Sequence, residues 1–123
     1  MTVTDFTKMR SILTRCDSTE SDTAVRRLCQ HYSSSWQTIK DILSINYYRR
    51  FTFPVYNRLD MPGVYAKTGT SRKFVDGWVC GGDGYYTVCV RVGNASGMSM
   101  KNSGYNTAGV IWHAVMEKLR HNT

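Results

Sequence analysis

The chain has 123 residues, which suits one small domain or a fragment of a larger one. Hydrophobic residues make up 41% and charged residues 20%, which is ordinary for a globular chain, and no apolar run approaches the length of a membrane span. The formal net charge of +7 favours anionic partners, namely phosphates, nucleic acid or carboxylates, without choosing among them. The first residues show no signal-peptide pattern, so we expect a cytoplasmic protein with no membrane association.

Apolar residues at helical spacing predict two helices in the first part of the chain. The first covers Thr4–Cys16, and the second runs from about Asp22 to Leu43. Three consecutive serines, at positions 33–35, have low helix propensity, so we expect the second helix to bend or split there. Short amphipathic helices are not stable alone, so both should pack on a sheet or on each other.

A run of aromatic and arginine residues follows at Tyr47–Phe51. Aromatic rings offer stacking surfaces and arginines contact phosphates, so the run suits nucleotides or single-stranded nucleic acid. The same run also fits a strand whose alternate aromatics enter the core, and the alternation continues through Phe53 and Val55. The continued alternation favours the strand.

Three short strands are predicted within Val64–Asn94. The first ends in the residues numbered 67–71, the second covers Phe74–Cys80, and the third covers Tyr85–Val92, with a tight turn at Gly81–Gly84. The third strand places its valines on one face and Cys89 on the other. Cys80 and Cys89 should lie close together, as a disulfide in an oxidising compartment or, the interpretation we favour, as buried thiols.

A closing helix is predicted over the residues numbered 107–120, with an apolar stripe that should pack on the valine face of the hairpin. The sequence therefore predicts an α+β fold. A small antiparallel sheet of about three to five strands packs against N-terminal helices and a C-terminal helix. We expect a single domain over 1–123, mostly helical over 1–46, with strands over 47–94. The four cysteines have no CxxC spacing, so no zinc site is expected. We predict no metal and no cofactor.

The end of the first predicted strand can form an anion site. Lys67 supplies a positive charge, hydroxyl donors come from the three residues Thr68, Thr70 and Ser71, and Gly69 lets a ligand approach the backbone closely. Arg72, Lys73 and Arg91 can assist electrostatically. A plain surface strand with a lysine on its exposed face is the alternative.

The segments KTGTSRKFVDGW, YTVCVRVGN and TAGVIWHAVMEKL together resemble the end of the transpeptidase domain of penicillin-binding proteins. In that family a lysine-threonine-glycine strand is followed by an aspartate-small-tryptophan strand, a third strand and a terminal helix. The resemblance covers Val64–Leu119. The positions that match the family pattern are Lys67, Thr68, Gly69, Asp76, Trp78, Gly93, Asn94 and Trp112. The resemblance implies that a carboxylate ligand binds at the strand that carries Lys67.

Ser44 and Asn46 resemble the serine and asparagine of the family's second motif, which move protons and contact the substrate amide. About twenty residues separate them from Lys67, whereas the family has a much longer segment there. These two residues can equally terminate a helix, and we favour that interpretation.

The family's nucleophilic serine is followed three residues later by a lysine that activates it, and this chain has no such pair. The sequence therefore predicts a non-catalytic module that binds an anionic small ligand, a carboxylate or a phosphate such as a nucleotide. A first alternative is a DD-transpeptidase or β-lactam-binding protein, residual or completed in a homo-oligomer. A second is a basic nucleic-acid-binding protein.

Overall fold

The computed structural model describes residues 2–4, 7, 23–51, 53 and 59–122, and within them it confirms the α+β class. The predicted helix Thr4–Cys16 lies almost wholly outside these residues. The elements are, in chain order, α2 (Thr23–His31), α3 (Ser33–Ser44), α4 (Asn46–Arg49), β1 (Tyr65–Thr70), a short 3₁₀ helix η1 (Arg72–Phe74), β2 (Asp76–Gly82), β3 (Thr87–Gly93) and α5 (Ala108–His121).

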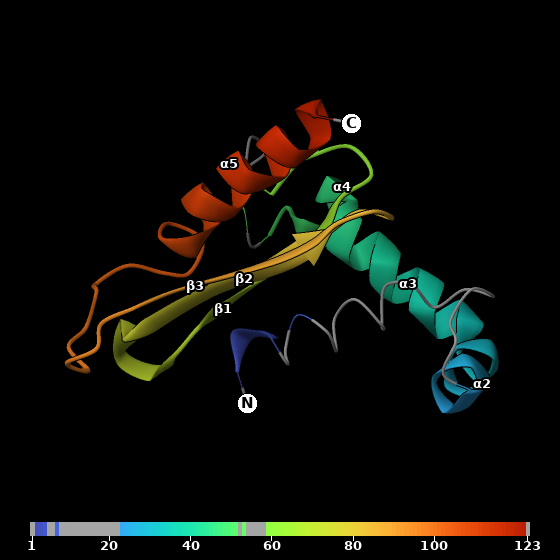
Figure 1. Cartoon of the computed structure of the whole chain (residues 1–123), viewed down its shortest axis with the longest axis horizontal. Coiled ribbons are helices and arrows are strands. Elements are labelled where there is room, and N and C mark those ends of the chain that lie inside the picture. Colours follow the sequence, from blue (N-terminus) through green and yellow to red (C-terminus); the bar gives the residue numbers. More distant parts are fainter. Residues whose placement is uncertain (1, 5–6, 8–22, 52, 54–58, 123) are drawn as a thin grey trace.

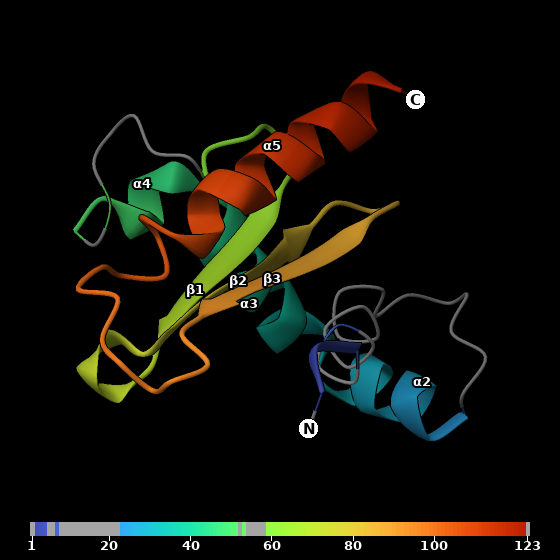
Figure 2. The same ribbon diagram turned by 60° about the vertical axis from the view of Figure 1, so that its left-hand side comes forward.

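The three strands form one antiparallel sheet in the order β1-β2-β3. Figures 1 and 2 show α5 running across one face of this sheet, over β2 and β3, while α3 lies beside β1 away from α5. The division between α2 and α3 falls at Tyr32, immediately before the three serines, so the predicted split is confirmed.

The core lies between the sheet and α5. Val79 of β2 and Trp112 and Met116 of α5 are fully buried. They pack with residues of the segment before β1, with Ala66 of β1 and with the valines of β3. The other residues of this cluster include Leu59, Met61, Val64, Ala108, Val88, Val90 and Val92. The prediction that the closing helix packs on the valine face is therefore confirmed.

The hairpin between β2 and β3 turns at Asp83–Tyr86, two residues later than predicted. The Asp83 Oδ1 atom accepts hydrogen bonds of 2.8 Å from the backbone N–H groups of Tyr85 and Tyr86, which fixes the turn. Gly81 lies inside β2. A Cβ atom there would be 2.8 Å from Trp112 Cζ2 and would overlap the Tyr65 carbonyl. The glycine at this position therefore lets Trp112 and β1 pack closely on β2, and it takes no part in the turn.

The strand predicted over Tyr47–Phe51 is wrong, because this segment forms most of α4 and the turn that follows it. The guanidinium of Arg49 is buried and donates to the backbone carbonyls of Leu43 (3.1 Å) and Ser44 (3.2 Å), which are the last carbonyls of α3. This contact folds the chain back on α3. Burial lowers the pKa of Arg49, and the nearby Asp60 carboxylate opposes that shift.

Cys80 and Cys89 form a disulfide with their Cα atoms 4.1 Å apart, so the favoured interpretation of buried thiols is wrong. The two residues are direct partners in the β2–β3 register. Cys29 is disulfide-bonded as well. Disulfides persist mainly in oxidising compartments, so this pairing argues against the cytoplasmic location predicted from the sequence. The location stays a prediction.

We predict that replacing both cysteines of the hairpin, with Cys80→Ser and Cys89→Ser in one variant, lowers the free energy of unfolding by about 2 kcal/mol, because the unfolded chain gains the freedom that the cross-link removes. Urea unfolding monitored by circular dichroism measures the change. Equal unfolding midpoints for the variant and the oxidised parent would contradict it.

Candidate functional site

β1 is an outer strand of the sheet, and Lys67 is exposed on it. The Ser71 N–H bonds the Asp76 carbonyl, and hydrogen-bonded positions alternate along an antiparallel pair. The backbone groups of Lys67 and Gly69 therefore face β2, and those of Thr68 face outward. The Lys67 ammonium donates to the outward Thr68 carbonyl at 2.5 Å. A charged donor and an outward peptide N–H thus stand together at this edge.

The strand alternation separates the predicted hydroxyl donors from Lys67. The side chains of Thr68 and Thr70 lie on the α5 side of the sheet with Ala66, whereas Lys67 and Gly69 lie on the opposite face. The Thr70 hydroxyl accepts a 3.0 Å hydrogen bond from the Gly104 N–H. It therefore holds the loop before α5 in place and does not point to the same side as the ammonium.

Ser71 and Gly69 also have structural roles. The Ser71 Oγ atom accepts a 2.7 Å hydrogen bond from the Asp76 N–H, which closes the turn between β1 and β2. A Cβ atom on Gly69 would lie 3.4 Å from the Trp78 Cβ atom, so glycine leaves the backbone open beside that indole. The close approach that was predicted at Gly69 is geometrically available on the face that carries Lys67.

Arg91 lies two strands away from β1, about 10 Å across the sheet from Gly69. Its guanidinium pairs with the Asp76 carboxylate at 2.6 Å and lies 5.8 Å from the centre of the Trp78 ring. The structure therefore brings Arg91 to the same face as Lys67 but engages it in an ion pair.

Arg72 and Lys73 are exposed in η1, directly after the end of β1. Lys73 and Phe74 have φ angles of 61° and 57°, a left-handed conformation that is uncommon for residues other than glycine. The turn thus holds two cations beyond the strand end, where they add positive potential without contacting Lys67.

Ser44 lies near the beginning of β1 rather than its end. Ser44 ends α3, donates a 2.7 Å hydrogen bond to the Lys40 carbonyl, and lines a cavity of about 260 Å³ with Tyr65. Asn46 is the first residue of α4. The favoured interpretation, that the pair terminates a helix, agrees with the placement of Ser44 at the end of α3, whereas Asn46 begins the next helix.

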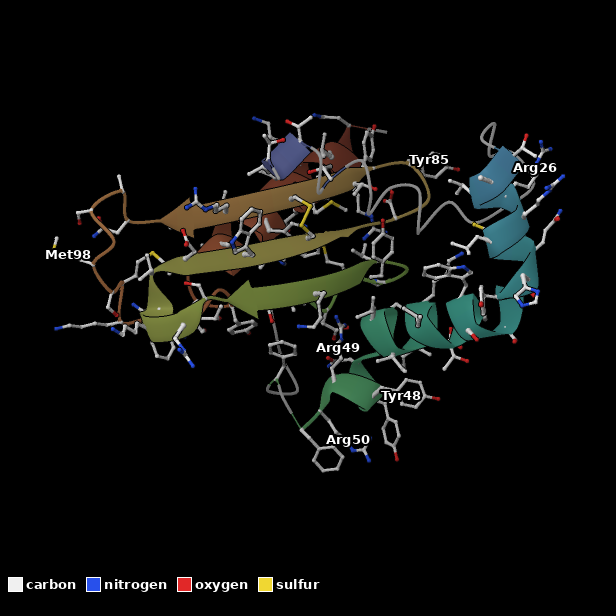
Figure 3. The ribbon with its side chains drawn as sticks, turned by 90° about the horizontal axis from the view of Figure 1, so that it is seen from below. Arg26, Tyr48, Arg49, Arg50, Tyr85 and Met98 are labelled. Atoms are coloured by element: carbon white, nitrogen blue, oxygen red, sulfur yellow. A yellow bond between two sulfur atoms is a disulfide. The ribbon has the colours of Figure 1, made fainter. Side chains whose placement is uncertain are left out.

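The sequence prediction missed an exposed aromatic patch on and after α4, made of Tyr47, Tyr48, Arg50 and Phe51. The Arg50 guanidinium lies 3.8 Å from the centre of the Tyr47 ring and 4.4 Å from that of Phe51, whose side chain is 87% exposed. Figure 3 shows Tyr48 and Arg50 pointing away from the sheet. The run itself was the available signal, but it was assigned to a strand.

Comparison of the chain with protein-family models, curated protein sequences and solved structures finds no match. The resemblance to penicillin-binding proteins therefore stays a prediction. Among the described residues, no group of three or more histidine, cysteine or acidic side chains is placed to hold a metal ion. No helix in the described part of the chain is both long enough and apolar enough to cross a membrane.

We predict that Gly104→Ala destabilises the protein by about 2 kcal/mol or more, because the new Cβ atom would lie 2.8 Å from the backbone nitrogen of Trp78 and would overlap the Gly69 carbonyl. Gly84→Ala is the matched control, since a Cβ atom at Gly84 meets nothing within 4 Å. Thermal unfolding of both variants measures the difference. Similar losses in the two variants would show that the loop does not fix the end of β1.

Proposed function

We propose that the chain is a non-catalytic module that binds an anionic ligand along the outer edge of β1. The observation that supports this most directly is the exposed Lys67 ammonium beside the outward backbone of Thr68 on an edge strand. Edge strands bind extended peptides through main-chain hydrogen bonds, and a nearby cation selects a ligand that carries a negative charge.

The ligand that fits this edge has an extended backbone and a carboxylate or phosphate group. A peptide that ends in a carboxylate can place its main chain against Thr68 and its negative charge near Lys67, while Arg72 and Lys73 extend the positive field beyond the strand end. A D-alanyl-D-alanine peptide is the ligand that the resemblance implies. Nucleotides supply the same charge without the extended backbone.

The alternative of a transpeptidase completed in a homo-oligomer shares this ligand but needs a nucleophile. The resemblance matches Ser44 to the family's second, proton-moving motif and not to the nucleophile. Its hydroxyl donates to the Lys40 carbonyl, and it lines a cavity with Tyr65, the first residue of β1, so it lies far along the strand from Ser71. A covalent adduct after incubation with a β-lactam, detected by mass spectrometry of the intact protein, would favour this alternative.

A thermal-shift panel with a D-alanyl-D-alanine peptide, a β-lactam and nucleotides identifies the ligand, since a molecule that binds only the folded state raises the melting temperature. We predict that Lys67→Ala weakens, about tenfold, the binding of the ligand that raises the melting temperature, because the variant loses one charge-assisted hydrogen bond. Isothermal titration calorimetry measures the dissociation constants.

The control for that prediction is Lys118→Ala, which removes the same charge from an exposed position on α5. Its affinity should match that of the parent protein at moderate salt. Equal weakening in both variants would attribute binding to net charge alone, and unchanged affinity in Lys67→Ala would remove the β1 edge as the site.

Single-stranded nucleic acid is the second candidate ligand, and the exposed aromatic patch favours it. Bases stack on exposed rings and a guanidinium interacts with phosphates, while the net charge of +7 attracts a polyanion. Tyr47 and Phe51 are both exposed on either side of the Arg50 guanidinium, so one strand can contact rings and cation together.

We predict that a variant carrying Tyr47→Ala and Phe51→Ala binds a short single-stranded DNA at least tenfold more weakly, because each base–aromatic stack contributes about 1–3 kcal/mol. Tyr85→Ala is the control, since Tyr85 is equally exposed but lies at the distant β2–β3 turn. Fluorescence anisotropy at two salt concentrations gives both affinities. If the parent protein binds no DNA, or the two variants bind alike, the aromatic patch is not a nucleic-acid site.

A further inference from the structure

The outer edge of β3 presents backbone groups that no described strand pairs with. The Asp83 N–H bonds the Tyr86 carbonyl and the Asn94 N–H bonds the Val75 carbonyl, which sets the alternation along β3. Val88, Val90 and Val92 therefore direct their N–H and C=O groups to β2. The residues that direct theirs outward are Thr87, Cys89, Arg91 and Gly93.

This edge lacks the protection that proteins give to strands that stay single. Proline, bulges and charged side chains commonly block such edges. β3 has the sequence TVCVRVG and contains no proline. The guanidinium of Arg91, its single charged side chain, is bonded to Asp76 of the neighbouring strand β2. β1 differs, because the Lys67 ammonium occupies the outward Thr68 carbonyl. Within the described part of the chain, no such cation lies over the outward carbonyls of β3, so β3 leaves more of its edge open than β1 does.

An apolar strip of α5 lies above the same edge. Successive residues of an α-helix are about 100° apart. Trp112 and Met116 point to the sheet, whereas His113 and Glu117 line a cavity with the Asp60–Pro62 loop on the β1 side. Ile111 and Val115 therefore face the opposite side, beyond β3. They are 48% and 38% exposed.

We infer that the β3 edge, together with Ile111 and Val115, is a homodimer interface. Two copies pair through antiparallel β3 strands into a continuous six-stranded sheet. The two-fold axis stands perpendicular to that sheet, so both α5 helices lie on the same face and bring their Ile111 and Val115 side chains together. The surface is thus self-complementary, as an isologous interface requires.

The helix spacing fits this arrangement. α5 lies over β2 and β3, and neighbouring strands are about 4.8 Å apart, so the two α5 axes would be about 10 Å apart across the seam. Packed helices have interaxial distances of about 8–10 Å, so side chains of this size can fill the space between them. In the described part of the chain this apolar strip is exposed to water.

The register follows from overlap and charge. Pairing centred on Val90 opposes Thr87 to Gly93 and thereby matches every residue of the strand. It places Arg91 opposite Cys89 of the second copy, and both residues direct their backbone N–H and C=O groups toward the seam. A register that opposes Arg91 to Arg91 would place like charges directly across the seam, which is destabilising. Pairing centred on Val90 therefore satisfies the outward backbone groups without charge repulsion.

The β1 edge and the aromatic patch lie elsewhere, so the dimer is independent of both proposed ligands. Analytical ultracentrifugation of the full chain across a wide range of concentrations should show a monomer–dimer equilibrium. Hydrogen exchange should slow at the amides of Thr87, Cys89 and Arg91 as the concentration rises. A monomer at every concentration, or fast exchange at these amides throughout, would overturn the inference.

Charged substitutions locate the interface. The pair Ile111→Glu and Val115→Glu should leave the circular dichroism spectrum unchanged and abolish the dimer. The control pair is Val110→Glu and Ala114→Glu, at exposed α5 positions that point away from the sheet, and it should dimerise like the parent. Loss of the dimer in both pairs, or in neither, contradicts the proposed interface.

A cross-link tests the register separately. Val90 would face its own copy at a non-hydrogen-bonded position, where opposite Cα atoms are about 4.5 Å apart and a disulfide can form. Val90→Cys should therefore give a covalent dimer on non-reducing gels that reduction removes. A chain that sediments as a dimer but gives no Val90→Cys cross-link would overturn the register centred on this residue.

Discussion

The contact between Trp112 and β2 determines most of the described structure. The indole is fully buried, packs where a side chain on Gly81 would stand, and donates a 3.2 Å hydrogen bond from Nε1 to the Val88 carbonyl. Burial of an aromatic ring of this size is a large share of the stability of a small domain. The indole also fixes the rotation of α5 about its axis. That rotation turns His113 toward the loop before β1 and Ile111 beyond β3.

A second junction ties the helices to the sheet through a buried charge. The Arg49 guanidinium reaches the carbonyls at the end of α3 and lies 3.5 Å from the Leu59 carbonyl, just before β1. Burial of this cation lowers its pKa, so its place in the fold depends on these acceptors and on Asp60 nearby. The aromatic residues on either side of Arg49 are consequently turned outward. One buried arginine thus exposes the patch formed by Tyr47, Tyr48, Arg50 and Phe51.

The sequence allowed the fold class to be predicted because its apolar periods are strong. The valine alternation of β3 and the helical stripe of α5 follow directly from residue spacing. The turn was misplaced because a pair of glycines can serve either a turn or close packing. Gly81 lies against Trp112 and Gly82 against the Tyr86 carbonyl, and both contacts appear only in the folded structure. The Tyr47–Phe51 run was misassigned for a similar reason, since short aromatic runs fit a strand or a helix until the partner of Arg49 is known.

The candidate site was predictable in part for the same physical reason. Lys67 was identified as an exposed cation at a strand, but its neighbours in sequence point to opposite faces, so Thr70 bonds Gly104 rather than a ligand near the ammonium. What remains at β1 is an edge with one cation over a backbone carbonyl. Among the described residues, no cation lies over the outward backbone groups of β3, and an apolar strip of α5 lies above them. The two outer strands of one small sheet are therefore chemically different, which suits β1 to a charged ligand and β3 to a polypeptide strand of its own kind.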